Sequence, residues 1–323
     1  MQKYQKLRFF SLMIFALISL PTFAADIHDD AGTVGAAFLK IDAGSRPVGM
    51  GGAFAGLAND VNTIYWNPAG LTAVRGRELM VMQNFSIADI NNEFIGYAQP
   101  INEKWVWGAS FIGAFTEIER RRGPSDEPDS TVTVGGFAAG LSLAYILSPE
   151  FSVGATAKAI SQQFDVEDSL GGATDVGLLL RLLDNRLGVG ISAQNLGFLD
   201  TDEDLPMNVR GGLAYQIRTK PSIADPTPPR DVFALVADVN IPIVAGFPSF
   251  HVGAENWFYD VLAVRAGYSV SKGENPRNGL TFGLGLRRKG EASLENVNFQ
   301  FDYAFVPDKD IGDAHRISFI TRF

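Results

Sequence analysis

The sequence predicts an all-β fold: a transmembrane antiparallel β-barrel of about 14 strands, with a small N-terminal hatch segment inside the lumen. Three observations predict it. The chain starts with a leader typical of exported proteins, and apolar and polar residues alternate with period two along most of the remaining chain. After the leader, no apolar run reaches the roughly 20 residues that a membrane helix needs, although 46% of the chain is hydrophobic.

Residues 1–24 have the composition of a secretory signal peptide. Three basic residues precede an apolar stretch, residues 9–20, and small residues follow at Ala24 and Ala25. Because the apolar run is short for a bilayer span, cleavage after Ala24 or Ala25 is favoured over a retained transmembrane anchor. The chain has no cysteine, which argues against disulfides, thiolate metal sites and lipoprotein processing.

Alternation is clearest near the C-terminus. From Val297 to Phe305 every odd position is apolar or aromatic, and the even positions are mostly polar or small. The segment from Asp313 to Phe323 alternates in the same way and closes on an aromatic residue, which an outer-membrane strand places at the membrane boundary. The resemblance of this strand to the last strand of outer-membrane barrels implies that Phe323 acts as a C-terminal assembly signal.

About fourteen such segments follow Glu78, each about as long as a tilted strand that crosses an outer membrane. Their expected centres are Met82, Ile95, Ser110, Leu141, Thr156, Gly177, Val189, Gly212, Leu235, Val252, Val264, Gly283, Phe301 and Phe319. A soluble β-sandwich or a surface-layer protein would also alternate. Aromatic residues at the strand ends favour the membrane barrel, because interfacial girdles are aromatic.

An even strand number places both ends of the barrel in the periplasm, where the connections should be short. Short turns are expected at residues 148–150, 183–185 and 259–260. Residues 220–230 depart from this pattern, since they form a long connection on the same side.

The phase of the strands predicts which side chains face the lumen. Six of them are charged: Arg210, Asp238, Arg265, Arg287, Asp302 and Arg316. Isolated charges there are costly unless they are solvated or paired. A structural network that braces the hatch is the favoured interpretation, and a polar solute pathway is the alternative. The acidic run at residues 200–204 has ligands suited to Ca²⁺, but a solvated outer loop is favoured.

Residues 25–77 lie between the leader and the barrel of residues 78–323, and their composition differs from both. Glycine and alanine are frequent in residues 36–71, without period-two alternation. A short helix from Gly51 to Ala58 and a turn at Asn67-Pro68 are expected, because proline disfavours a helical backbone at the preceding residue. The small residues would let this segment pack closely against the barrel wall.

Three stretches of this segment carry a family resemblance: Phe38 to Gly52, Asn59-Asp60, and Tyr65 to Leu71, which contains the triplet Asn67-Pro68-Ala69. They resemble the start of the PorV/PorQ family, within the FadL-like superfamily of outer-membrane barrels, and the triplet is similar to the Asn-Pro-Ala motif of those proteins. In fatty-acid transporters of the superfamily this region forms a hatch inside a fourteen-stranded barrel. The resemblance implies these hatch residues: Gly51, Gly52, Asp60, Asn67, Pro68 and Ala69.

The resemblance implies two different functions. PorV-type relatives serve type IX secretion by receiving cargo proteins and passing them to attachment machinery, so the leading expectation is a secretion accessory or cargo-handling barrel. The alternative is a FadL-type channel for hydrophobic small molecules such as long-chain fatty acids. Expected partners are outer-membrane lipid, the barrel assembly machinery, and either secretion-system components and cargo or a hydrophobic small molecule. The expected location is the outer membrane of a Gram-negative-type bacterium.

Other classes of function find little support in the sequence. The three histidines, His28, His251 and His315, lack metal-ligand spacing, and no Gly-x-Ser-x-Gly nucleophile elbow occurs. The net charge of −9 argues against a nucleic-acid partner. We therefore expect no catalysis, no cofactor and no metal.

Overall fold

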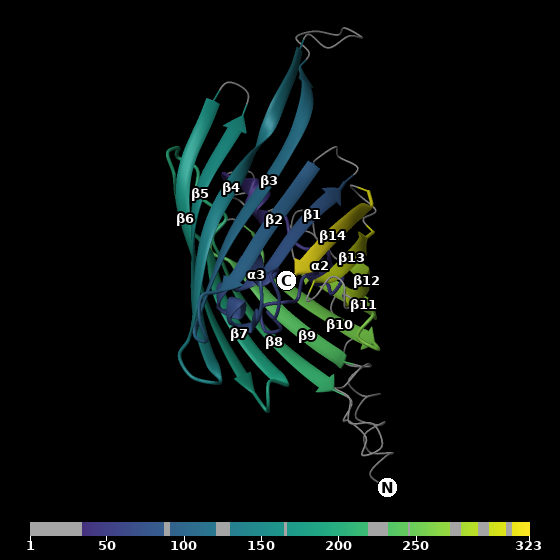
Figure 1. Cartoon of the computed structure of the whole chain (residues 1–323). Coiled ribbons are helices and arrows are strands. Elements are labelled where there is room, and N and C mark those ends of the chain that lie inside the picture. Colours follow the sequence, from purple (N-terminus) through teal and green to yellow (C-terminus); the bar gives the residue numbers. More distant parts are fainter. Residues whose placement is uncertain are drawn as a thin grey trace, which may run out of the picture.

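The computed structural model describes residues 34–86, 91–120, 130–164, 167–218, 232–244, 246–271, 279–289, 297–307 and 312–323. The expected signal peptide and the long connection at residues 220–230 lie outside the described residues. Within them, the strands form one closed barrel (Figure 1). Each strand pairs antiparallel with its neighbours in sequence, and β14 pairs with β1 to close the sheet.

The strands are β1 (Glu78–Phe85), β2 (Asn91–Pro100), β3 (Trp105–Arg120), β4 (Ser130–Ile146), β5 (Phe151–Phe164), β6 (Glu167–Leu182), β7 (Leu187–Leu199), β8 (Asn208–Arg218), β9 (Val232–Pro242), β10 (Ser249–Phe258), β11 (Leu262–Ser271), β12 (Gly279–Lys289), β13 (Asn298–Val306) and β14 (Ala314–Arg322). Every one of the expected centres falls in its own strand. The prediction of a fourteen-stranded transmembrane barrel is therefore confirmed.

Alternating burial identifies the two faces of the wall. On β14 the apolar side chains of Ile317 and Phe319 are exposed on the outside, while Arg316, Ser318 and Ile320 between and beside them are buried inside. Period-two alternation produces this arrangement, because successive side chains of a strand point to opposite faces. In the described part of the chain, no helix is long and apolar enough to span a bilayer.

The strands differ in length around the barrel. Strands β3, β4, β5 and β6 have 16, 17, 14 and 16 residues, whereas β10 to β14 have 9 to 11. In Figure 1 the longer strands extend well above the rest of the wall. At the opposite end lie the short turns that join β4 to β5, β6 to β7 and β10 to β11, at the expected places. In the second of these turns Leu183, Asp184 and Asn185 have φ angles of 54°, 55° and 61°.

The segment before β1 lies inside the barrel and is called the plug here, residues 34–77. It contains four short helices: η1 (Ala37–Lys40), α2 (Ser45–Val48), α3 (Thr63–Trp66) and η2 (Pro68–Ala73). Most of its apolar residues are buried, and Phe54 and Trp66 are completely buried. Figure 1 shows α2 and α3 enclosed by the strands.

The expected helix from Gly51 to Ala58 is wrong. Residues 51–58 form turns and irregular backbone instead. Gly51 and Gly52 adopt φ angles of +72° and +78°, outside the right-handed helical region. The N–H groups of Phe54 and Ala55 bond to the wall rather than to a helix of their own. Tertiary contacts thus replace the local hydrogen bonds of a helix.

Candidate functional site

The plug approaches the wall closely because the wall presents glycine there. A Cβ atom added to Gly190 on β7 would lie 2.0 Å from the backbone oxygen of Ala55, and one added to Gly267 on β11 would lie 2.0 Å from the nitrogen of Gly51. No side chain fits at such a distance. We call this set of inward-facing residues the glycine girdle: Gly154, Gly177, Gly188, Gly190, Gly212, Gly253 and Gly267.

Asn67 of the expected hatch motif joins the plug to β6. Its Nδ2 atom donates to the backbone oxygens of Ala55 and Leu178, both at 3.1 Å. Its Oδ1 atom accepts from the N–H of Ala69 at 3.1 Å, and Pro68 begins η2. Asparagine is suited to this position because its amide donates and accepts at once. The motif therefore shapes the plug and also anchors it.

Arg46 of the plug is the centre of a buried charge network. It donates through Nε and Nη2 to Glu255 on β10, at 2.7 and 2.6 Å, and through Nη1 to Asp60 at 2.6 Å. Glu255 also accepts from Nε of Arg265 on β11 at 2.7 Å. Nη1 of Arg265 lies 2.9 Å from Oδ1 of Asp302 on β13. Bidentate contacts between a guanidinium and a carboxylate are strong and fix the orientation of both side chains.

The network continues from Asp302 back to the plug. Gln300 donates to Asp302 at 2.7 Å and accepts from Arg322 on β14 at 2.9 Å. Arg322 also donates to Glu78 on β1 at 2.9 Å, and Glu78 accepts the N–H of Val61 at 2.9 Å. Val61 follows Asp60 in the chain, so the path closes. We call it the charge ring: Arg46, Asp60, Val61, Glu78, Glu255, Arg265, Gln300, Asp302 and Arg322.

The two charged plug residues of the ring are held in their ionised forms. Burial by itself raises the pKa of Asp60, but the charges of Arg46 and Arg322 outweigh burial and keep that pKa below its ordinary value. Burial lowers the pKa of Arg46, and the carboxylates of Glu255 and Asp60 more than compensate, so its pKa lies above its ordinary value. Each charge thus depends on its partners.

A second group of polar contacts holds the irregular stretch after Gly52. Oδ2 of Asp238 on β9 accepts the N–H groups of Phe54 and Ala55 at 2.9 and 2.8 Å. Arg210 on β8 donates to the backbone oxygen of Gly52 at 2.9 Å and lies 3.9 Å from Asp238. Its guanidinium also stands over the ring of Trp66, 4.6 Å from the centroid.

The structure places all six expected lumen charges on inward-facing positions. Arg265 and Asp302 belong to the charge ring, and Arg210 and Asp238 hold the stretch after Gly52. Arg316 donates to the backbone oxygen of Asp42 and to Asn84, at 2.5 and 3.1 Å. Arg287 pairs with Asp260 and Gln300 and stands 4.0 Å from the ring centroid of Trp257.

Sequence reasoning missed several residues of the network. Glu78, Glu255 and Arg322 lie on strands and face the lumen, as the expected charges do. The period-two pattern of those strands could therefore have identified them. Arg46 lies in a segment without a periodic pattern, and no local signal marks it. Of the expected hatch residues, Asp60 and Asn67 bond to partners, while Gly51 and Gly52 provide backbone at close approaches.

The other side of the lumen is lined differently. Apolar side chains of β1 to β7 meet apolar side chains of the plug in one buried cluster. We call these wall residues the apolar half of the lumen: Met80, Met82, Phe94, Ala98, Val106, Ile112, Ala114, Ala138, Ala144, Ile160, Ala173 and Leu199. From the plug, Phe38, Val61, Ile64 and Leu71 pack against them.

One ion pair lies within this apolar side. Nζ of Lys158 on β5 is 2.7 Å from Asp175 on β6, and it donates to Asn195 on β7 at 2.7 Å. The register of β6 and β7 shifts at Asp175, where Asn195 adopts a φ of 57° and donates its N–H to the carboxylate. The pair therefore satisfies the groups that the β-bulge leaves unpaired.

Among the described residues, no group of three or more His, Cys, Asp or Glu side chains is arranged to hold a metal ion. His251 contacts the backbone oxygen of Gly51 at 2.7 Å, and His315 contacts the hydroxyl of Tyr303 at 2.7 Å. The acidic outer loop meets the plug through its backbone, where Gly35 donates its N–H to Asp204 at 3.0 Å.

The comparisons with known proteins agree with this architecture. The uncharacterised protein family UPF0164 matches residues 23–159, less than half of the chain, and no curated protein matches it. The toluene transporter TodX of Pseudomonas putida is similar in structure, with a TM-score of 0.61 and 13% identity over 87% of this chain and 97% of TodX. The toluene transporter TbuX of Ralstonia pickettii has a TM-score of 0.60 and 12% identity over 88% of this chain and 99% of TbuX.

A TodX deltaS2 mutant, described as a monoaromatic hydrocarbon channel, gives a TM-score of 0.60 and 12% identity over 87% of this chain and 99% of that one. Identities this low show the fold and nothing finer. The chain therefore shares its fold with these proteins, and its described residues form a closed fourteen-stranded wall around an N-terminal plug.

Proposed function

We propose that this protein is an outer-membrane channel for small hydrophobic molecules. The observation that carries the proposal is the apolar half of the lumen, a buried cluster of apolar residues of β1 to β7 that faces apolar plug residues. Sites for small molecules are usually lined by apolar side chains with a few polar groups. The shared fold with toluene transporters supports the same assignment. No catalytic step is part of the proposal.

The physical chemistry of the two sides of the plug supports a route along β1 to β7. A hydrophobic solute that enters there replaces one apolar contact with another, so little solvation energy is lost. On the opposite side, the same movement would leave Arg46, Glu255 and Arg265 buried without partners, which is strongly unfavourable. We therefore propose that the charge ring keeps the plug attached to the wall while the plug moves away from the apolar half to let a hydrophobic solute pass.

The secretion function that the resemblance to PorV/PorQ implied has less support. Its support is the motif around Asn67. In this structure Asn67 anchors the plug, a role that does not distinguish a secretion barrel from a channel. The structural likenesses are to hydrocarbon channels. We retain the secretion role only as an outcome of the test, together with the cargo and secretion-system partners that it would require.

The test is uptake by cells that carry the protein in an otherwise intact outer membrane. We expect radiolabelled toluene or a long-chain fatty acid to enter several-fold faster than in cells without the protein, while a polar sugar enters at the same rate. Equal entry of the hydrophobic solutes with and without the protein would contradict the channel. Co-purification of a secreted protein in that case would favour the secretion role.

A matched pair of variants on β4 locates the route. Ala138 is buried on the lumen face and Ala139 is exposed on the outer face. Ala138→Trp should slow hydrophobic uptake several-fold by filling the apolar half, and Ala139→Trp should leave it unchanged. Heat-modifiable gel mobility confirms that both variants fold. Equal uptake by the two folded variants would place the route elsewhere.

A further inference from the structure

A cavity of about 230 Å³ lies between the plug and the wall at the end of the barrel that carries the short turns. It is separate from the apolar half of the lumen and plays no part in the proposed route. Plug residues Asn59 and Thr72 form one side, and inward-facing residues of β5 to β8 form the other. Its lining is polar, with donors from hydroxyl and amide groups.

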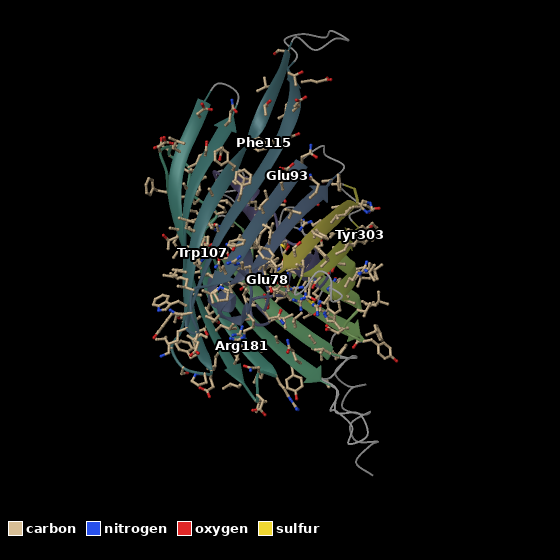
Figure 2. All side chains as sticks on the ribbon, viewed as in Figure 1. Glu78, Glu93, Trp107, Phe115, Arg181 and Tyr303 are labelled. Carbon is tan, nitrogen blue, oxygen red and sulfur yellow. The ribbon has the colours of Figure 1, made fainter. Side chains whose placement is uncertain are left out.

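Three arginines line this cavity: Arg75, Arg181 and Arg186. Figure 2 shows Arg181 toward the end with the short turns. None of the Asp and Glu residues that the structure describes lines the cavity or forms an ion pair with these arginines. The side chain of Arg181 donates only to neutral oxygens, the hydroxyl of Thr72 at 3.4 Å and the backbone oxygen of Ala58 at 3.1 Å.

This arrangement contrasts with that of several other arginines inside the barrel, one on the plug and three on the wall. Arg46, Arg265, Arg287 and Arg322 each lie within 4 Å of a carboxylate. Like charges gathered in a partly closed space repel one another, and water compensates less there than outside. An anion in the cavity would remove this repulsion. Guanidinium groups present planar, paired donors that match the oxygens of phosphate and carboxylate groups.

We propose that this cavity is a binding site for a phosphate-type oxyanion at the short-turn mouth of the barrel. Arg181 and Arg186 supply the charge-assisted hydrogen bonds, Arg75 adds charge from the exposed rim, and the side-chain amide of Asn59 offers a neutral donor. The phosphate group has two possible sources, a free ion and the headgroup of a lipid, and the same cavity chemistry serves both.

The experiment is isothermal titration calorimetry of the full-length protein in detergent, with chloride used to hold the ionic strength constant. Inorganic phosphate should bind saturably, and Arg181→Gln combined with Arg186→Gln should weaken binding at least tenfold. Arg77→Gln is the matched control, because Arg77 is exposed at the same end and does not line the cavity. It should change the affinity less than twofold. Arg181→Lys keeps the charge but lacks the planar guanidinium, so its affinity for phosphate should lie between those of the wild type and the double variant.

A short-chain phosphatidic acid below its micelle concentration separates the two sources. Tighter binding than inorganic phosphate, lost in the same double variant, assigns the site to a lipid headgroup, and the reverse order assigns it to a free ion. If the double variant does not fold by heat-modifiable mobility, Arg186→Gln alone is used. The proposal is overturned if neither probe binds the wild type saturably, or if the folded arginine variants bind as tightly as Arg77→Gln. Hydrophobic uptake is measured separately, so failure of the channel proposal leaves this result unaffected.

Discussion

The two sides of the lumen hold the same plug by different physics. Most of the wall residues that pack on it in the apolar cluster come from β1 to β7, such as Met80 and Ile112, whereas most of the buried charged residues around it come from β8 to β14, such as Glu255 and Arg265. Apolar contacts have no required direction and tolerate substitution by similar volumes. Buried ion pairs are directional, and removal of one member leaves the other unpaired. This difference is the reason for our proposal that the plug is held on its charged side and can be displaced on its apolar side.

Removal of the plug should have the largest effect. Deletion of residues 49–71 should leave a barrel that still inserts, because the strands hydrogen-bond to one another. Single-channel recordings in planar bilayers at matched insertion should then show steady conductance that the intact protein lacks. If the intact protein already conducts like an open porin, residues 49–71 do not block the lumen. If the deletion prevents insertion, the barrel wall needs the plug in order to form.

Glu255→Gln on the charged side should loosen the plug by about 3–5 kcal/mol, because Arg46 and Arg265 lose a shared charged partner. On the apolar side, the volume-conserving change Met80→Leu should cost less than about 1.5 kcal/mol. Hydrogen exchange of plug amides measures both. Glu93→Gln is the control, since Glu93 is exposed on β2 (Figure 2) and should change nothing. If Glu255→Gln and Met80→Leu reduce the exchange protection of the plug equally, the charged and apolar sides do not differ in how strongly they hold it.

Gly190→Ala tests the close approach that both sides share. The added Cβ would lie 2.0 Å from the backbone oxygen of Ala55, so the plug must shift, at about 1–3 kcal/mol. Gly211→Ala is the matched control on the neighbouring strand, where the nearest atom to the added Cβ is 3.7 Å away. Faster proteolysis of the plug should occur in the first variant alone. The same rate in both would mean that the wall adapts easily.

Acidification should have the smallest effect above pH 4. The pKa of Asp60 is below its ordinary value, so its contribution to plug docking is fully present above the pKa of the unfolded chain, about 3.9. It is lost only as the pH falls through the lower folded value. The contribution of Asp60 to exchange protection of the plug, measured as the difference between the wild type and Asp60→Asn, should therefore be equal at pH 7 and pH 5. A marked loss at pH 5 would mean that Arg46 does not hold the charge of Asp60.

The candidate site could be predicted from the sequence only in part. Arg210, Asp238, Arg265, Arg287, Asp302 and Arg316 were identified because each lies on a strand whose alternation gives its face directly. Arg46 was not, because residues 36–71 have no period from which a face could be inferred. The helix expected from Gly51 to Ala58 failed for a related reason: local propensity cannot foresee that Asp238, 183 residues further on, accepts the N–H of Ala55.

The sequence by itself determined the strands, their number and the direction of their side chains, because alternation is a local property of an extended chain and repeats in every strand. Only the tertiary structure decided how the plug folds and what holds it. The charge ring brings together residues from Arg46 to Arg322, and the glycine girdle becomes meaningful only when the plug backbone lies against it. Such contacts depend on the closure of the barrel, which fixes the spatial relation between distant residues.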